Sequence, residues 1–186
     1  MLPATDIDAT NGPPAMKRIQ RDETEFLALI ERHAGIVRKV AMSYSRSAAD
    51  RRDLEQEIVA QLWKSYATFD GRRPFSTWMY RVALNVAISI ARSQRWQEPE
   101  AASLDDHALE TLADDADDVE REHGISELRD FIAGLDELNR ALILLYLDEH
   151  NYREIADILG ISETNVATKI SRVKQRLRAR MNPQGE

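Results

Sequence analysis

The chain has no cysteine, few glycines and prolines, and no long apolar run. Its 186 residues include 7 Gly, 6 Pro and no Cys. The lack of cysteine excludes disulfides and cysteine-ligated metals, which suits a reducing cytosol, so we expect a cytoplasmic protein. No apolar stretch approaches the roughly 20 residues that span a bilayer, and we expect no membrane insertion. The N-terminus lacks a basic region followed by an apolar segment, so we expect no signal peptide.

Charge is unevenly distributed along the chain, although the formal net charge is −7. Residues 98–122 hold eleven acidic residues and one basic residue, Arg121. This segment has few large apolar residues and no clear period, which predicts an acidic flexible linker over residues 97–124. Residues 72–95 instead contain five arginines and no acidic residue. Such a locally basic segment suits a polyanionic partner, whatever the net charge.

Hydrophobic spacing predicts an all-α protein made of two small helical domains. We expect amphipathic helices over Glu23–Ser45, Ala48–Tyr66 and Phe75–Arg95. No stretch shows the sustained alternation of a strand, so we expect no sheet. The first residues are rich in Pro, Gly, Asp and Thr, which predicts a disordered N-terminal extension. The expected divisions are an extension over residues 1–20 and domains over residues 21–96 and 125–182.

The segment Tyr152–Leu177 has the pattern of a helix-turn-helix. A small residue, Ala156, is followed four positions later by Gly160 and six positions further by Val166. These are the offsets at which the motif places a small residue, a turn glycine and a buried aliphatic residue. Residues 164–180 include six basic residues and no acidic one. A unit of this kind places its second helix in the DNA major groove.

The candidate DNA contacts of this unit lie mainly on its second helix. Basic side chains are expected to contact phosphates, whereas side chains early in the helix are expected to contact base edges. The candidates are Arg153, Glu163, Thr164, Asn165, Thr168, Lys169, Ser171, Arg172 and Arg176. The alternative is an ordinary helical hairpin with a solvated basic face, which would not require the alanine, glycine and valine at these offsets.

The third expected helix combines aromatic residues with arginines and almost no opposing charge. Single-stranded nucleic acid is bound by such mixtures, because bases stack on aromatic rings while arginines contact phosphates. From the residues alone, DNA contact and a purely structural role are equally favoured for the aromatic residues. The candidate contacts are Arg72, Arg73, Trp78, Tyr80, Arg81 and Arg92.

Three segments, in the same order along the chain, resemble those of bacterial sigma factors. Residues 53–63 (DLEQEIVAQLW) resemble their polymerase-binding helix, and residues 69–71 (FDG) with 75–85 (FSTWMYRVALN) resemble their promoter-melting segment. The helix-turn-helix resembles their second DNA-binding domain. The short length and the two-domain layout are similar to the extracytoplasmic-function group. The resemblance implies a transcription initiation factor that binds core RNA polymerase and directs it to specific promoters, with both domains contacting duplex or melted promoter DNA.

The same resemblance assigns residues and partners. The first segment would pack on the clamp helices of the largest polymerase subunit, through Asp53, Leu54, Gln56, Glu57 and Trp63. The residues alone equally allow a solvated acidic face with Trp63 in the core. Asn85 joins the candidate DNA contacts, and an anti-sigma factor is expected as a further partner. Sigma factors of this group often carry a basic residue just after the buried valine of the recognition helix, where this chain has Ala167.

Two other classes of function stay open at this point. One is a helix-turn-helix transcription regulator that acts without binding polymerase. The other is a helical enzyme, whose best candidates are His107 with Asp105 and Asp106, and His150 with Asp148 and Glu149. Metal ligands on a helix prefer spacings such as i and i+4, which share one face, whereas these residues are adjacent. We therefore expect no catalytic residue, no metal and no cofactor.

Overall fold

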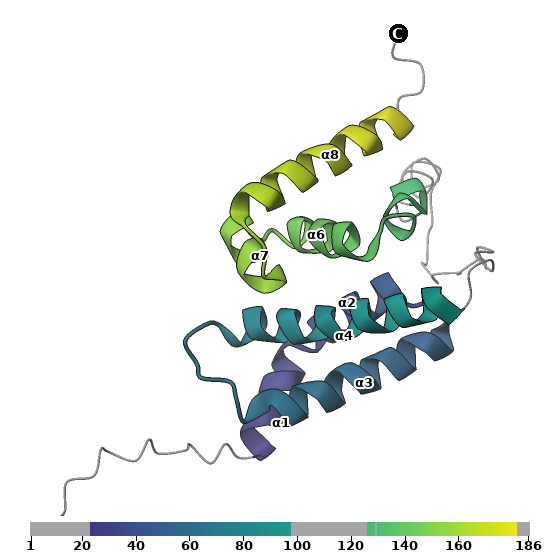
Figure 1. Cartoon of the computed structure of the whole chain (residues 1–186). Helices are drawn as coiled ribbons and strands as arrows, with labels where there is room; N and C mark the ends of the chain where they lie inside the picture. The colour runs from purple at the N-terminus through teal and green to yellow at the C-terminus, as the bar shows by residue number, and fades with distance from the viewer. Residues whose placement is uncertain (1–22, 98–125, 129, 182–186) are drawn as a thin grey trace, which may run out of the picture.

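The computed structural model describes residues 23–97, 126–128 and 130–181. Within these ranges the chain contains helices and no strand, which confirms the predicted all-α class. Helices α1 to α4 form one group, and α6 to α8 form a second group beside it (Figure 1). The predicted N-terminal extension lies outside the described residues, as does the predicted acidic linker after residue 97.

The first expected helix is divided into two helices at His33. Helix α1 spans Glu23–Arg32 and α2 spans Ala34–Tyr44, so the prediction of one continuous helix to Ser45 was wrong. The backbone at His33 has φ −111° and ψ 15°, outside the α-helical region. Gly35 follows closely, and glycine in a helix costs roughly 1 kcal/mol relative to alanine. This local weakness favours a break here over a continuous helix.

Helix α3 spans Ala48–Tyr66, as predicted, and α4 spans Phe75–Gln97, two residues beyond its predicted end. The Ser47 side chain caps α3 by accepting a hydrogen bond of 3.0 Å from the Asp50 amide. Before α4 the chain turns through Gly71, whose φ of +70° is accessible to glycine without steric cost. Helices α2, α3 and α4 pack on one another and form the centre of the first group.

Helix α6 spans Glu137–Leu147 and was not predicted. Asp136 caps it, because its side chain accepts a hydrogen bond of 3.0 Å from the Asn139 amide. Four residues of the apolar run that follows are buried: Ala141, Leu142, Ile143 and Leu145. A capping aspartate followed by an apolar run was therefore the sequence signal for this helix.

Helices α7 (Tyr152–Leu159) and α8 (Glu163–Met181) form the predicted helix-turn-helix. Gly160 ends α7 in the left-handed conformation, with φ 68° and ψ 33°. A Cβ atom added there would meet nothing within 4 Å, so the backbone angle and not crowding favours glycine. The inner side of α8 buries Val166, Ile170 and Val173. These three residues are spaced four and three apart, so they lie on one side of the helix.

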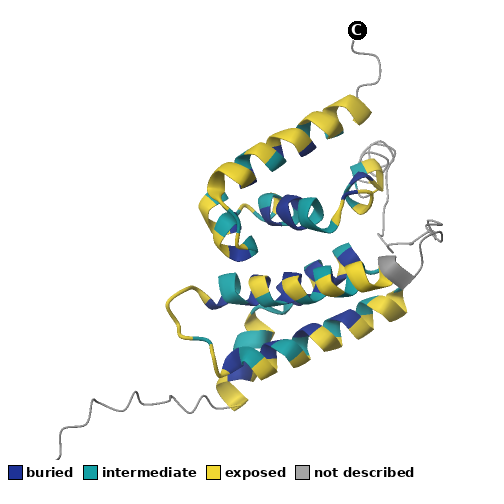
Figure 2. Ribbon diagram, viewed as in Figure 1, coloured by how far each residue is buried: buried dark blue, intermediate teal, exposed yellow. Residues whose placement is uncertain are grey.

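The two groups of helices pack against each other. Helix α4 contacts α6 and α7, α2 contacts α6, and one continuous apolar core includes residues of both groups. Figure 2 shows buried residues on the facing sides of the two groups. The Tyr44 hydroxyl donates a 2.6 Å hydrogen bond to the Glu137 carbonyl, and Arg140 donates one of 3.1 Å to the Ser43 carbonyl. We call this contact of α2 and α4 with α6 and α7 the domain interface.

Candidate nucleic-acid and polymerase interfaces

The outer side of α8 is exposed to solvent, opposite the stripe that packs on α6 and α7 (Figure 2). Lys169 on this side is half-buried. The exposed candidate residues are Glu163, Thr164, Asn165, Thr168, Ser171, Arg172 and Arg176. None of the candidate contacts on this helix is therefore buried in the core. Of the candidates outside α8, Arg153 on α7 is also exposed.

The first turn of α8 is well ordered by local hydrogen bonds. The Asn165 amide donates to the Ser162 hydroxyl at 3.2 Å, and the Thr168 hydroxyl donates to the Thr164 carbonyl at 2.9 Å. Glu163 lies in the first turn, where a negative charge interacts favourably with the helix dipole. These bonds leave the exposed Asn165 side chain on a fixed backbone, and an asparagine in this setting can pair with adenine in the major groove.

The basic residues of α8 fall into two groups with different surroundings. Lys169, Arg172 and Arg176 are spaced three and four apart and therefore share one side of the helix. Lys174 lies elsewhere: its Nζ donates to the Tyr146 hydroxyl at 2.5 Å and sits 4.0 Å from the centre of that ring. Lys174 thus attaches α8 to α6, a role that charge counting in the sequence could not separate from DNA contact.

A cluster of aromatic rings and arginines lies at the start of α4. The Trp78 ring is half-buried and lies 5.2 Å from Phe69 and 5.3 Å from Phe75. A small hollow of about 80 Å³ is bordered by Phe69, Asp70, Arg73, Thr77, Trp78 and Arg81. Arg72 and Arg81 near this end of α4 are exposed, as are Asn85 and Arg92 further along the helix. The start of α4 is the part that holds the rings. This part of α4 combines an accessible ring with cationic groups, which is the chemistry that single-stranded nucleic acid requires.

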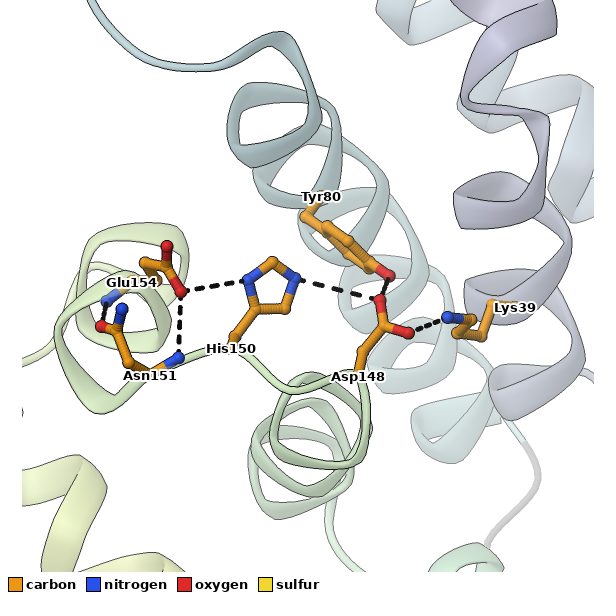
Figure 3. Close-up of polar contacts among 6 residues, drawn as sticks. All are labelled: Lys39, Tyr80, Asp148, His150, Asn151 and Glu154. Atoms are coloured by element: carbon orange, nitrogen blue, oxygen red, sulfur yellow. Dashed lines mark hydrogen bonds and ion pairs between the residues drawn. The ribbon is translucent and has the colours of Figure 1, made fainter.

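Tyr80 differs from the other candidates on α4 because it is 2% exposed. Its hydroxyl donates to Asp148, at the end of α6, and Asp148 also accepts from Lys39 on α2 (Figure 3). Burial and the hydrogen bond to Asp148 raise the pKa of Tyr80 well above its ordinary value. In this arrangement Tyr80 belongs to the domain interface and has no surface to offer to a base.

The candidate polymerase contacts Asp53, Leu54 and Glu57 line a groove of about 650 Å³ between α3 and α4. The α4 side of this groove contributes Val82, Asn85, Val86, Ser89, Ile90 and Gln94. Asp50, one turn before Asp53, adds a third carboxylate and was missed in the sequence, where the spacing of these acids was the available signal. The groove therefore has acidic residues beside apolar ones.

The other two candidate polymerase contacts, Gln56 and Trp63, do not line this groove. At 100° per residue, Trp63 lies about 80° to 120° around α3 from Asp53 and Glu57. Gln56, three positions from Asp53, lies between these two directions. Trp63 is 47% exposed, and the edge of its ring packs on Phe26 of α1 at 5.0 Å between centres. Of the five residues assigned by resemblance, three thus line the groove, Trp63 lies on another surface of α3, and Gln56 lies between them.

Of the two histidine groups considered as catalytic candidates, the one around His150 lies at the domain interface. His150 lies 3.9 Å from the Asp148 carboxylate and 3.6 Å from that of Glu154, and it packs edge-on to the Tyr80 ring. Among the described residues, no group of three or more His, Asp or Glu side chains could hold a metal ion. The group around His107 lies outside the described residues. No helix in the described part of the chain has the length and apolarity to cross a membrane.

Taken together, an exposed recognition helix, an aromatic and arginine-rich helix, and an acidic groove define a two-domain helical DNA-binding protein. The family model for Sigma-70 region 2 matches residues 29–97, and that for Sigma-70, region 4 matches residues 125–177. The chain belongs to the sigma-70 family, in its extracytoplasmic-function (ECF) group. It is a transcription initiation factor that directs RNA polymerase to promoters, and not a regulator that acts without polymerase.

Known relatives and structures agree with this assignment. The chain is 28% identical to the ECF RNA polymerase sigma factor RpoE of Cereibacter sphaeroides, over 94% of this chain and 97% of that protein. It is 29% identical to the ECF RNA polymerase sigma-E factor of Haemophilus influenzae, over 90% and 94%. The fold is similar to that of CnrH in complex with the cytosolic domain of CnrY (TM-score 0.63, 21% identity, 88% and 92% covered). It is also similar to RpoE of Bartonella quintana, solved with the anti-sigma factor NepR (TM-score 0.62, 18% identity, 87% and 97% covered).

Proposed function

We propose that this initiation factor works through three surfaces, each with polar or charged residues that are exposed to solvent. The outer side of α8 binds duplex promoter DNA in the major groove. The cluster of Trp78 with Arg73 and Arg81 binds the melted strand. The acidic groove between α3 and α4 binds core RNA polymerase. The observation that carries the proposal is that α8 buries Val166, Ile170 and Val173 on one side and exposes polar residues on the other.

On α8, the division of labour follows from position along the helix. Thr164, Asn165 and Thr168 lie near the N-terminal end, which approaches base edges when a recognition helix enters the groove. Arg172 lies one turn further and is long enough to reach a guanine edge. Arg176 and Lys169 contact phosphates, which position the helix without specifying sequence. Arg153, on the preceding helix, adds a phosphate contact.

In the groove, three carboxylates beside apolar side chains fit a basic amphipathic helix of the partner. We assign this partner to the clamp helices of the largest polymerase subunit. Trp63, exposed on the other side of α3, provides a second contact with an adjacent part of the same subunit. Truncating an aromatic anchor at an interface commonly costs about 2 kcal/mol or more.

Three further proposals complete this function. The chain acts by binding and not by catalysis, and it acts in the cytoplasm, where RNA polymerase works. Its two groups of helices correspond to functional units over residues 21–96 and 125–182, joined by an acidic flexible linker. An anti-sigma factor binds and inhibits it; support comes from Bartonella quintana RpoE, a protein of similar fold whose structure was solved with one.

The test is run-off transcription with purified core RNA polymerase on a pool of genomic promoter fragments, followed by mapping of start sites. We expect transcripts from a small set of fragments that share a common upstream sequence. Glu57→Lys should abolish these transcripts by weakening binding to core polymerase, while binding of the isolated protein to duplex DNA is retained. The matched control is Glu55→Lys, on the same helix but outside the groove. Transcription indistinguishable from that of core polymerase alone would refute the proposal.

A further inference from the structure

The domain interface places carboxylates of the second group of helices on cationic and aromatic groups of the first. Asp148, at the end of α6, accepts hydrogen bonds from Lys39 and Tyr80 (Figure 3). Asp157, on α7, lies 3.4 Å from the Arg73 guanidinium, and its carbonyl accepts a 3.5 Å hydrogen bond from the same group. Two of the residues predicted from the sequence to contact DNA, Tyr80 and Arg73, are therefore already bound within the chain.

A carboxylate in these positions has the chemistry of a DNA phosphate. Both are anionic oxygen acceptors for lysine and arginine, and both form charge-assisted hydrogen bonds stronger than neutral ones. Burial alone would raise the pKa of Asp148. The hydrogen bonds from Lys39 and Tyr80 outweigh this effect, so the pKa lies below its ordinary value and the negative charge is stabilised. The neighbouring titratable groups are His150, 3.9 Å from Asp148, and Glu154, 3.6 Å from His150. Lys39 is the lysine that Asp148 contacts directly.

The second DNA-binding surface of the molecule is not affected by this contact. The outer side of α8 stays exposed, while α6 and α7 cover one side of α4. We call this packing of the two groups the closed arrangement. In it, α8 is free to bind duplex DNA, whereas the part of α4 that α6 and α7 cover is not free to bind a melted strand.

We propose that the domain interface is an autoinhibitory contact in which Asp148 takes the place of a DNA phosphate on Lys39 and Asp157 takes that place on Arg73. The hydrogen bond from Tyr80 to Asp148 helps to hold this contact closed. The closed chain binds single-stranded promoter DNA only after the interface opens and Tyr80 and Arg73 are released. This inference rests on the proposed role of α4 in binding the melted strand. The apparent affinity for single-stranded DNA is then the intrinsic affinity reduced by the fraction of open molecules.

The first test compares two substitutions that remove one negative charge from adjacent residues. Asp148→Asn in the full-length chain should strengthen binding of a fluorescent single-stranded oligonucleotide about tenfold, the effect of losing one charge-assisted hydrogen bond from the closed state. Glu149→Gln, at an exposed position, is the matched control for a general gain of positive charge and should change the affinity little. Equal gains for both variants would overturn the proposal.

A second substitution tests the role of the tyrosine hydroxyl. Tyr80→Phe keeps the ring for stacking but removes the donor to Asp148, so it should also strengthen single-strand binding, severalfold. Combined with Asp148→Asn it should add little, because both substitutions break the same hydrogen bond. Weaker binding by Tyr80→Phe would show that the hydroxyl serves DNA directly and would overturn the proposal.

The geometry is measured independently of affinity. The chain has no cysteine, so Ala60→Cys on α3 and Gln175→Cys on α8 provide two labelling sites. A donor and an acceptor dye at these sites report the distance between the two groups by Förster resonance energy transfer. Saturating single-stranded oligonucleotide should lower the transfer efficiency, whereas unchanged transfer in the DNA-bound chain would overturn the proposal. If Asp148→Asn opened the chain without a gain in affinity, the masking of DNA contacts would be refuted. Should Trp78→Ala then also leave single-strand binding unchanged, the failure would lie with the proposed α4 surface itself.

Discussion

Helices α4 and α8 both carry candidate DNA contacts, but they separate packing from binding in different ways. On α8 the buried residues Val166, Ile170 and Val173 occupy one side, and polar candidates occupy the other. On α4 the candidate aromatic contacts lie in the same stretch as the core residues, so that Tyr80 is buried and Trp78 is half-buried. When a helix binds through its polar side, the spacing of its apolar residues shows which side packs and which side binds. When it binds through aromatic residues, this spacing does not separate the two roles.

The largest expected effect comes from breaking the packing side of α8. Ile170 is fully buried, and Ile170→Ala should lower the free energy of unfolding by about 2–5 kcal/mol, because it removes buried apolar atoms and leaves a cavity. Thr168→Ala, exposed on the same helix, is the matched control and should change stability by less than about 0.5 kcal/mol. Urea denaturation followed by circular dichroism measures both. A similar loss for the two variants would mean that the two sides of α8 are not functionally distinct.

The next effect tests the mixed surface of α4. Trp78→Ala should weaken binding of single-stranded DNA by about 1–3 kcal/mol, the contribution of one stacked base. Duplex promoter binding by the isolated protein should change little, because α8 supplies that contact. The measurement is fluorescence anisotropy with the two kinds of DNA, after circular dichroism has shown that the variant is folded. Equal losses on both would place Trp78 in the core alone.

A third prediction compares two arginines on α8. Arg172→Ala should cost about 1–3 kcal/mol and relax preference at one promoter position, if its guanidinium pairs with a guanine edge. Arg176→Ala should weaken all sequences evenly and lower the salt slope by about one unit. Binding is measured on single-base promoter variants at several salt concentrations. A uniform loss for both would assign both arginines to phosphates and leave base contact to Thr164, Asn165 and Thr168.

The same contrast explains what could be predicted from the sequence. The helix-turn-helix could be predicted because Ala156, Gly160 and Val166 each have one structural role at a fixed offset. The break at His33 was missed, since neither of its neighbours interrupts the apolar spacing. The burial of Tyr80 could not be predicted, because its partner Asp148 lies 68 positions away in sequence. The division of Asp53 and Glu57 from Trp63 was available from helix geometry, but resemblance grouped them together.

The smallest expected effect is a pH dependence of the domain interface. The pKa of folded Asp148 lies below the ordinary value of 3.8, because the hydrogen bonds from Lys39 and Tyr80 outweigh the effect of burial. A carboxyl group whose pKa is lower when folded stabilises the folded state above the unfolded pKa, and this contribution is lost as the pH falls through the folded pKa.

The difference in unfolding free energy between the wild type and Asp148→Asn should therefore stay constant from neutral pH down to about pH 5 and shrink below about pH 4. Asp136, whose pKa is also lowered since hydrogen bonds from Asn139 outweigh burial, contributes equally to both proteins and cancels in the difference. Urea denaturation of both proteins across this range provides the measurement. A difference that did not change with pH would show that the Asp148 carboxylate does not stabilise the closed arrangement by its charge, and α4 would then be held against α6 and α7 by apolar packing alone.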